Sequence, residues 1–483
     1  MKHYIAITLG PITRVISMAK STKELWAASY LFSYLAKQLI RPFKERNFLL
    51  PYLDPKMDQP EVTLGAGVYP DRYIFEAQEG DFESLCERAD QVLADLAIDI
   101  TAKLSLKVDM SKVEAYLRHT LKIYFCELAF DDSQVDQVVS LCEQRLATLE
   151  CQDCYPLKEQ KQEDYLPQYF SRVNDSFLVK DGFGGEKKGR LFETVLECSS
   201  GGKTMEDTAL LLPYEKYIAI VRADGDNLTE TLKQLKAKGK DIQSLSSALF
   251  EFSIQAIACI KEFGGMAIFV GGDDLLFFAP VRRGQNNQTI FDLISELDGA
   301  FKDCLNKALK EEAPSTLSFG VSMTYHKFPL FEAVEQAEDL LSKAKRAPGK
   351  NHLAWRLRKH SGQIVQGLMP KADSELYQQF GNLLAIAKDE QQKEDFFRSF
   401  TYWLSANSTH LAYLLSKPAE SAARMLINCF RNNFNEDVHV GKASFEQQLV
   451  DYLLAAAKAS EKPEQAIDEL VAVLRFVGFL ISK

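Results

Sequence analysis

Four aspartates in two short segments are the residues of this chain best suited to hold divalent metal ions. Asp224 and Asp226 follow an apolar run, and Asp273 and Asp274 follow a Gly-Gly pair. Clustered carboxylates repel one another unless a cation joins them, and Mg²⁺ prefers carboxylate oxygens while leaving positions for phosphate. Two such ions can hold both the attacking and the leaving oxygen of an in-line displacement. The aspartates therefore predict a nucleotidyl-transfer site that uses two Mg²⁺ or Mn²⁺ ions.

The segments around these aspartates have the pattern of a small sheet. A continuous apolar run, Tyr217–Val221, predicts a buried strand that ends just before Asp224. Two further apolar runs, Met266–Val270 and Leu275–Ala279, are joined through Gly-Gly, which predicts a tight hairpin. With the helical periodicities between and after them, the order over residues 211–362 is strand, helix, strand, strand, helix, strand, helix. This is the split βαβ order of ferredoxin-like sheets, which nucleotide-polymerising palm domains share.

Residues beside the aspartates complete the predicted site. In a split βαβ sheet the first strand and the hairpin are neighbours, so Asp224 and Asp273 should lie close together. A bare Gly-Gly turn also lets a nucleotide approach the backbone closely. Residues 340–360 contain seven Lys or Arg and no Asp or Glu, and a lysine there would suit a triphosphate. The other residues that we expect beside the metal ions or the nucleotide are Gly225, Asn227, Gly271, Gly272, Lys345 and Lys350.

Each of these segments also has an ordinary structural interpretation. Asp and Gly are common in surface turns, so Asp-Gly-Asp or Gly-Gly-Asp-Asp alone would indicate only a turn. Basic residues are common at helix C-termini, where they complement the helix dipole. The metal-binding interpretation is favoured because both acidic segments follow buried strands of one predicted sheet.

The cysteines give a weaker indication of a second metal site. Cys151 and Cys154 form one C-x-x-C, whereas a structural zinc site usually has four ligands. Cys142 and Cys198 are further candidates, and no second C-x-x-C exists. We therefore expect a degenerate zinc site around Cys151 and Cys154, for which bound zinc is the less favoured interpretation.

Length and composition indicate an ordinary globular protein. The chain has 483 residues, 26% charged and 46% hydrophobic, with a net charge of −10 and nine cysteines. The negative charge argues against a protein that coats nucleic acid with its own surface. We expect a cytoplasmic α+β protein without a membrane span, because the cysteines are odd in number and no long apolar run occurs. The expected domains are an N-terminal ferredoxin-like, inactive palm-like domain (1–118), a helical linking domain (119–210), a cyclase-like catalytic palm (211–362) and a C-terminal helical bundle (363–483).

Three parts of the sequence resemble a known family. The opening of the chain reads LGPITRVISMAKSTKELWAASYLFSYLAKQL, and the acidic segments read YIAIVRADGDNL and FVGGDDLLFF. The third part reads SFGVSMTYHKFPLFEAVEQAEDLLSKAKRAPGKN. With the domain order, these parts resemble the large subunit of type III CRISPR effector complexes, the CRISPR polymerase family, and most closely its Cmr subtype.

The resemblance implies a function in antiviral defence. In that family a guide RNA captures a complementary transcript, and capture activates the palm, which joins ATP molecules into cyclic oligoadenylate and releases pyrophosphate. By the resemblance, Asp224 and Asp273 are metal ligands and Asp274 is the second acid of the pair. Lys345 contacts the triphosphate, and Asp226 lies close to the site. The implied partners are other Cmr-type subunits, the guide RNA and target RNA through the complex, and ATP, but no membrane.

Departures from the family leave alternatives open. Many members begin with an HD-type nuclease domain, and this chain has no room for one and no His-Asp pair, so we expect no HD nuclease activity. Some members without that domain are implicated in joining AMP from ATP to S-adenosylmethionine, which makes a SAM-AMP synthase the first alternative. A non-catalytic scaffold subunit is the second, although all four acids are retained. A stand-alone diguanylate cyclase is the third, although its hairpin has acidic-Glu-Phe where this chain has Asp-Asp-Leu.

Overall fold

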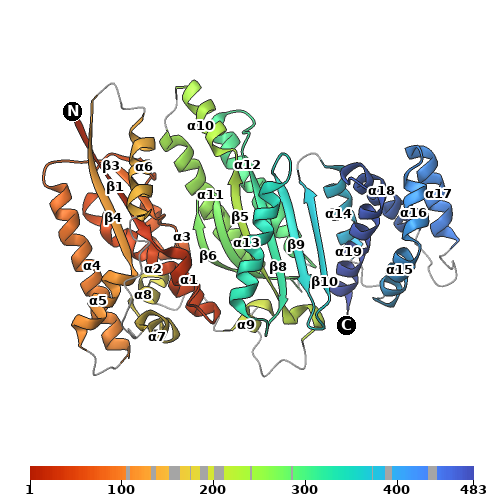
Figure 1. The fold of residues 1–483 in the computed structure, drawn as a ribbon, viewed down its shortest axis with the longest axis horizontal. Coiled ribbons are helices and arrows are strands. Elements are labelled where there is room, and N and C mark those ends of the chain that lie inside the picture. Colours follow the sequence, from red (N-terminus) through yellow and green to blue (C-terminus); the bar gives the residue numbers. More distant parts are fainter. Residues whose placement is uncertain are drawn as a thin grey trace.

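The structure is a computed structural model in which three parts lie in a row (Figure 1). These are an N-terminal sheet domain, a central sheet domain and a C-terminal group of helices, so the expected α+β class is confirmed. Within the described residues, no helix has the length and apolar character that a membrane span requires. The structure describes residues 1–104, 109–131, 137–151, 164–174, 176–184, 194–200, 211–239, 242–283, 287–371, 374–386, 394–432 and 443–482.

The N-terminal domain is a four-stranded antiparallel sheet with the strand order β2-β3-β1-β4. Its strands are β1 (Lys2–Gly10), β2 (Phe48–Leu50), β3 (Arg72–Glu76) and β4 (Lys122–Phe130). Its helices are α1 (Ile12–Ile16), α2 (Thr22–Ile40), α3 (Pro60–Thr63), α4 (Asp81–Leu104), α5 (Met110–Thr120) and α6 (Val138–Cys151).

Helix α2 begins at a capping interaction. The Ser21 hydroxyl accepts a hydrogen bond from the Glu24 backbone N–H, and the Glu24 carboxylate accepts one from the Lys20 N–H at 2.8 Å. The first bond satisfies a backbone donor that a helix start otherwise leaves unpaired, and the second ties the residue before the cap to the first turn. The helix is buried along most of its length, because it is packed within the domain and also contacts the central sheet.

The first sheet extends beyond residue 118, which corrects the expected domain boundary. Strand β4 pairs with β1 along its whole length, from Lys2 opposite Phe130 to Gly10 opposite Lys122. All residues of β4 except the last are at least partly exposed. A strand with so little burial has a faint apolar alternation, so it is easily mistaken for part of a helical region.

The described part of the linking segment is divided between the two sheet domains. Helices α7 (Tyr165–Ser171) and α8 (Phe177–Phe183) contact α2, whereas α9 (Val195–Ser199) packs against the central sheet. Asp181 in α8 accepts hydrogen bonds from the Tyr30 hydroxyl at 2.8 Å and from Lys37 Nζ at 2.9 Å. Because both partners belong to α2, this helix is an extension of the N-terminal domain.

The central domain is a six-stranded sheet with the order β10-β9-β8-β5-β7-β6. Strands β8 and β9 are parallel, and the other neighbours are antiparallel. The sequence predicts that the first strand and the hairpin are neighbours. The first strand is β5, the hairpin is β6–β7, and β5 pairs with β7. The strands are β5 (Tyr217–Asp226), β6 (Met266–Gly271), β7 (Asp274–Pro280), β8 (Thr316–Tyr325), β9 (His352–Arg358) and β10 (Ile364–Pro370).

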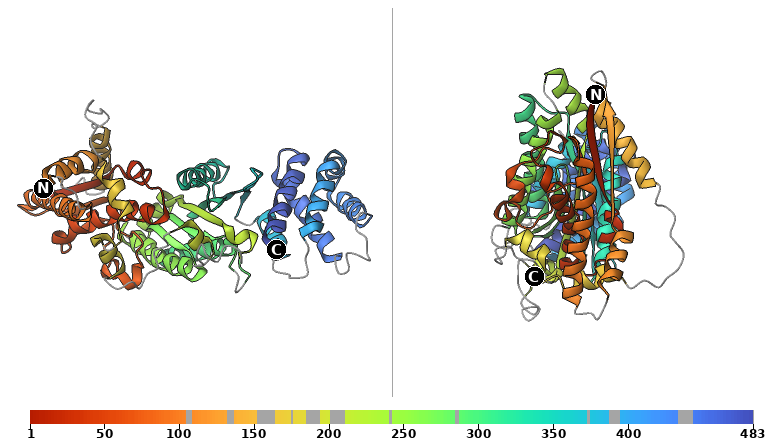
Figure 2. Two further views of the ribbon diagram at one scale, coloured as in Figure 1. Left: turned by 90° about the horizontal axis from the view of Figure 1, so that it is seen from below. Right: turned by 90° about the vertical axis from the view of Figure 1, so that its left-hand side faces the viewer.

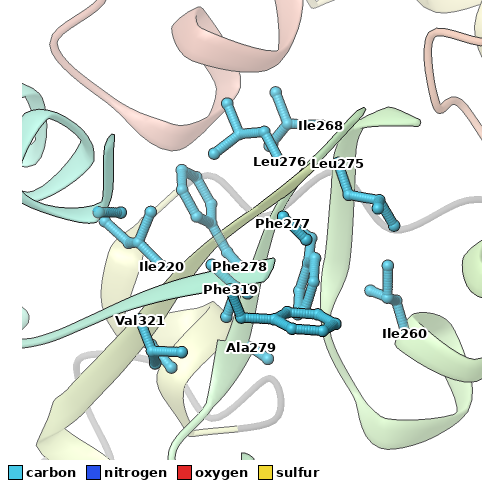
Figure 3. Packing of buried hydrophobic residues seen from close by; sticks show 14 of the residues in the cluster. Ile220, Ile260, Ile268, Leu275, Leu276, Phe277, Phe278, Ala279, Phe319 and Val321 are labelled. Carbon is cyan, nitrogen blue, oxygen red and sulfur yellow. The ribbon is translucent and has the colours of Figure 1, made fainter. Parts of the chain in front are cut away.

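Helices cover both faces of the central sheet. Gly320 of β8 faces α13, because a Cβ there would lie 2.3 Å from the Ala337 carbonyl oxygen. On the opposite face, Trp355 of β9 contacts Phe291 of α12, with ring centroids 6.0 Å apart. Figure 3 shows the core of this domain, where Ile260 of α11 lies beside sheet residues. The helices of this domain are α10 (Leu228–Ala237), α11 (Ile242–Phe263), α12 (Ile290–Leu309) and α13 (Leu330–Arg346).

The central sheet also extends beyond its expected boundary at residue 362. Strand β10 pairs with β9, with Gly367 opposite Trp355. Gly367 and Pro370 make this segment a poor strand by sequence. Gly367 is needed there because a Cβ would lie 2.6 Å from Nε1 of Trp355. The close approach of an indole ring thus explains why the strand signal is weak.

The C-terminal part is helical, as expected, and packs on the end of the central sheet (Figure 2). Phe476 of α19 contacts Trp355 and Phe291 at ring centroid distances of 5.3 and 5.4 Å. Aromatic side chains therefore hold this part against the palm-like sheet. Its helices are α14 (Glu375–Ala385), α15 (Glu394–Ala406), α16 (Ser408–Leu415), α17 (Ala419–Arg431), α18 (Ala443–Ala459) and α19 (Pro463–Ile481).

The two sheet domains are joined through the backbone of β6. Gly67, in the loop before β3, forms an isolated parallel bridge with Phe269. In this bridge the Val270 N–H donates to the Gly67 carbonyl oxygen at 3.1 Å. A Cβ on Gly67 would lie 3.2 Å from Cβ of Ser33 in α2, so the loop is held tightly between α2 and the sheet.

Candidate active site

Strand β5 carries a row of polar side chains on one face of the central sheet. Alternation along a strand places Arg222, Asp224 and Asp226 on the same face. Arg222 is opposite Gly320 in the register with β8, and Gly320 faces α13. The polar row therefore lies on the α13 face of the sheet, at the end of β5 where burial decreases.

The β6–β7 turn brings two more acids to the end of β5. Gly271 is paired with Asp274 across the turn, and Gly272 has a φ of +73°, which favours glycine. The Gly272 N–H donates to the Ser253 hydroxyl of α11 at 3.0 Å, and this bond ties the turn to α11. A Cβ on Gly225 would lie 2.7 Å from Oδ2 of Asp273. The missing side chain at Gly225 thus makes room for Asp273 against β5.

The acids at this turn have raised pKa values. Burial raises the pKa of Asp273, and the negative charge of Asp224 raises it further. Burial also raises the pKa of Asp274 to about 6, against the opposing effect of Arg222, whose guanidinium is 3.1 Å away. Asp224, Asp273 and Asp274 are therefore close enough to repel one another, as the spacing of the two segments predicts.

Lys345 is the residue of the basic segment 340–360 that reaches the acids. It is in the last turn of α13, and its ammonium group forms an ion pair with Asp224 and donates to the Gly225 carbonyl oxygen at 3.1 Å. Lys350, in contrast, is exposed in the turn after α13, and within the described residues its side chain forms no ion pair with these acids. Asn227 starts α10 with a φ of 57°, and its side chain caps no helix N–H. The structure therefore brings Lys345 to the site, but not Lys350.

Asp226 has a different environment from the other three acids. It is fully buried, and its Oδ2 accepts hydrogen bonds from the Ser318 hydroxyl at 2.7 Å, the Asn351 N–H at 3.0 Å and the Thr316 hydroxyl at 3.1 Å. These bonds tie the end of β5 to β8 and to the start of β9. Asp226 is therefore a structural anchor through Oδ2, and its expected role as a metal ligand stays a prediction.

Two residues near the acids are missing from the predicted site. Arg222 forms ion pairs with Asp274 at 3.1 Å and with Glu338 of α13 at 2.8 Å. Arg222 is two residues before Asp224, so strand alternation would place it on the same face. Glu338 is distant in sequence, and only the packing of α13 reveals it.

The donor set fits a divalent cation in part. Within the described ranges, no three His, Cys, Asp or Glu side chains already form a group that could hold a metal ion. Asp224, Asp273 and the Gly225 carbonyl nevertheless offer the hard oxygen donors that Mg²⁺ and Mn²⁺ prefer. Burial is the main cause of the raised pKa of Asp273, the negative charge of Asp224 adds to it, and Lys345 opposes it.

The predicted zinc site falls mostly outside the described residues. Cys151 is exposed at the end of α6, and Cys154 lies outside the described residues. Cys142 is buried in an apolar cluster with Tyr4 and Leu146, and burial raises its pKa. A thiol in that environment is suited to packing in the core. Zinc at Cys151 and Cys154 stays a prediction.

Comparison with known protein families identifies both sheet domains. The central sheet matches the family description "Cas10/Cmr2, second palm domain" over residues 217–354. This match defines a palm-domain protein. The N-terminal domain matches "CRISPR-associated protein Cmr2, N-terminal" over residues 4–103. Both sheet domains are therefore similar to domains of Cas10/Cmr2 proteins.

A curated relative and two solved structures agree with this assignment. The CRISPR system Cmr subunit Cmr2 of Pyrococcus furiosus is 34% identical over 128 residues, which are 26% of this chain and 14% of that protein. The match thus spans a small part of the curated relative's length. The Csm1-Csm4 cassette in complex with cA3 is 11% identical, with a TM-score of 0.54 over 100% of this chain and 70% of that chain. The complex with cA4 is 13% identical, with a TM-score of 0.52 over 99% and 70%. At these identities the structural likeness shows the fold.

Proposed function

We propose that this chain is the large subunit of a type III CRISPR effector complex and makes a nucleotide messenger by nucleotidyl transfer when target RNA is bound. The observation that carries the proposal is the convergence of Asp224, Asp273 and Asp274 at one edge of a Cas10/Cmr2 palm domain. Structures of the same fold hold cA3, cA4 and AMPPNP. These ligands support ATP as the substrate and cyclic oligoadenylate as a product.

Each residue of the site has a separate role in the proposed reaction. Asp224 and Asp273 would hold two Mg²⁺ or Mn²⁺ ions, and these ions would offset negative charge on the transferred phosphate. Lys345, beside Asp224 and the Gly225 carbonyl, is placed to bind the triphosphate. Asp274, whose pKa is raised to about 6, is mostly ionised near neutral pH and is suited to accept the proton of the attacking hydroxyl.

Partners follow from the same proposal. The chain would assemble with other Cmr-type subunits and meet the guide RNA and target RNA through them. The donor of AMP is ATP, and the acceptor is either a second ATP or S-adenosylmethionine, because both alternatives use the same donor chemistry. The expected lack of HD nuclease activity stays a prediction, and single-stranded DNA cleavage by the assembled complex would contradict it.

The test is pyrophosphate release by the assembled complex with target RNA, ATP and Mg²⁺ or Mn²⁺, with and without S-adenosylmethionine. We expect the double variant Asp273→Ala/Asp274→Ala to lose at least about 100-fold in rate, the scale of an essential electrostatic group. Assembly should be unchanged, and Asp339→Ala, an exposed acid on α13, should be fully active. A wild-type complex that releases no pyrophosphate would support the scaffold alternative. Turnover of GTP by the isolated chain would support the cyclase.

A further inference from the structure

Helix α11 contacts the turn that carries Asp273 and Asp274. The central residues of this turn are Gly272 and Asp273, because Gly271 and Asp274 are the last paired residues of β6 and β7. Positive φ at the first central residue alone is the pattern of a type II′ hairpin turn. The N–H of that residue has no partner in the strand ladder. The Gly272 N–H must therefore be paired by another element or by water.

Ser253 of α11 supplies that partner. Its side chain is buried, with 1% exposed, and its Oγ accepts from the Gly272 N–H at 3.0 Å. Its hydroxyl proton is donated to the Leu249 carbonyl oxygen at 3.0 Å, since the Gly272 N–H can act only as a donor. Both bonds of the hydroxyl are thus defined. Leu249 also lies against the turn, because a Cβ on Gly272 would be 3.5 Å from Leu249 Cβ.

A shift of this turn would move both of its acids. Asp273 follows Gly272 directly and lies so close to β5 that a Cβ on Gly225 would be 2.7 Å from its Oδ2. Asp274 is the first residue of β7 and pairs with Arg222 at 3.1 Å. Displacing a reacting group by roughly 1 Å can cost about 100-fold in rate. The bond to Ser253 is therefore placed to determine where both carboxylates lie.

The other end of the same helix face is anchored on the N-terminal domain. The Gln243 side-chain amide donates to the Phe48 carbonyl oxygen of β2, and the Ser246 hydroxyl accepts from the Tyr52 N–H at 2.8 Å. Ser246 lies three residues after Gln243 and seven residues before Ser253, so helical spacing places these three side chains on one face. One helix therefore connects the N-terminal domain to the turn.

A second contact of the N-terminal domain ends at the same turn. Val270, the residue before Gly271, donates its N–H to the Gly67 carbonyl oxygen at 3.1 Å. On its other side α11 is packed against α12, where the rings of Phe252 and Phe301 have centroids 5.1 Å apart. Close-packed interiors transmit displacements because they contain little free space. A change at the domain contact should therefore reach the turn.

We propose that Ser253 is a positioning residue for Asp273 and Asp274, and that α11 makes the position of their turn depend on its contact with the N-terminal domain. This inference rests on the proposed function. Ser253 is buried behind the turn and acts through the Gly272 backbone. The N-terminal domain thereby contributes to nucleotidyl transfer through a helix of the palm.

The first test measures pyrophosphate release against Mg²⁺ concentration in the assembled complex with target RNA and ATP. We expect Ser253→Ala to lower kcat and to raise the half-maximal Mg²⁺ concentration, each about three- to tenfold, the scale of one hydrogen bond. At saturating Mg²⁺ the KM for ATP should stay within about twofold. Ser253→Thr keeps the hydroxyl and should restore the wild-type values. Ser247→Ala, which alters a partly exposed serine on another face of α11, should match wild type.

The outcomes distinguish this inference from the proposed function. An active wild type with unchanged kcat and Mg²⁺ dependence in Ser253→Ala would overturn the inference and keep the proposed function. A wild type without pyrophosphate release would overturn the proposed function. Amide hydrogen exchange of the full chain then still reports on the turn, where we expect Ser253→Ala, but not Ser247→Ala, to speed exchange at least about threefold. Equal kinetic losses in Ser253→Ala and Ser253→Thr, with unchanged exchange at the turn, would indicate packing and overturn the inference.

A double-mutant cycle tests the connection to the N-terminal domain. Ser246→Ala removes the acceptor of the Tyr52 N–H. We expect this variant alone to raise the half-maximal Mg²⁺ concentration at least about twofold, and to have no further effect when Ser253→Ala is already present. Effects of the two substitutions that simply add, or an unchanged Mg²⁺ dependence in Ser246→Ala, would show that α11 does not transmit the domain contact.

Discussion

At Gly225 a single missing methyl group decides where Asp273 can lie. A Cβ there would be 2.7 Å from Asp273 Oδ2 and 2.8 Å from Asp273 Cβ, both too close for real contacts. The space between β5 and the β6–β7 turn is therefore filled by the carboxylate itself. The second residue of the Asp-Gly-Asp motif contributes shape, while its carbonyl oxygen accepts from Lys345.

We predict that Gly225→Ala moves Asp273 and lowers pyrophosphate release at least about tenfold, because small displacements of reacting groups are costly. The free energy of unfolding should fall by no more than about 1–3 kcal/mol, the usual cost of overpacking. Gly299→Ala is the control, because Gly299 is exposed in α12 and a Cβ there meets no atom within 4 Å. It should keep full activity and gain about 0.5–1 kcal/mol from helix propensity. Full activity of Gly225→Ala would contradict the steric argument.

The two aspartates of the motif should respond differently to the same substitution. Asp226→Asn replaces a charged acceptor by a weaker carbonyl oxygen on the three donors and puts a buried amide at the position of Oδ1, which has no partner, so we expect a loss of about 1–3 kcal/mol in the free energy of unfolding. Asp224→Asn should change stability by less than about 1 kcal/mol, because it removes only an incompletely buried ion pair. It should instead abolish pyrophosphate release. Urea unfolding and the release assay distinguish the two, and equal stability losses would refute the division of roles.

The sequence predicts the acids of this site better than it predicts their separate roles. Asp224 and Asp273 are placed together by strand order alone. Asp226 has the same residue type and a similar position, but its partners Ser318 and Asn351 are distant in the chain. Glu338 likewise meets Arg222 only because α13 packs across the sheet. Such contacts depend on tertiary packing, which a local pattern does not contain.

At the scale of elements, a segment with strong hydrophobic periodicity is predicted correctly from the sequence, whereas a strand that is little buried is not. The hairpin at Gly-Gly and the capped helix α2 follow their sequence signals, because each is determined by local chemistry. Strands β4 and β10 are harder to predict. Strand β4 is mostly exposed, and β10 contains Gly367, which lies against the indole ring of Trp355. Both are outer strands of their sheets, where selection for apolar alternation is weakest.

Helix α19 contains a carboxyl group whose titration should affect stability. Burial raises the pKa of Glu469 from 4.5 to about 7, so the folded protein holds its proton over a pH range in which the unfolded chain has lost it. The stability that this proton contributes is complete below pH 4.5 and is lost as the pH rises to about 7.

We therefore predict that Glu469→Gln, which mimics the protonated form, stabilises the protein more at pH 8 than at pH 5. The difference should be about 2 kcal/mol, since one pKa unit corresponds to about 1.4 kcal/mol. Chemical unfolding at the two pH values measures it. Glu464→Gln, an exposed acid in the first turn of the same helix, should show no such dependence. A pH-independent effect of Glu469→Gln would mean that the carboxyl group is solvated.

At the scale of the whole molecule, the order of the parts follows from the sequence but their contact surfaces do not. Two sheet domains and a helical end are visible as changes in pattern along the chain. A cavity of about 600 Å³ between the two sheet domains is lined by residues of α1, α2, β7 and α13, which no single segment predicts. The lining of that cavity therefore emerges only when the domains are placed side by side.

The backbone bridge between Gly67 and β6 has a consequence for handling the palm alone. Strand β6 is the last strand of the central sheet, and Gly67 covers part of its outer side. Uncovered sheet edges recruit strands from other chains and promote aggregation. A fragment that starts at residue 211 would lack this cover, and we expect it to self-associate in light scattering. A fragment that contains both sheets should remain monodisperse.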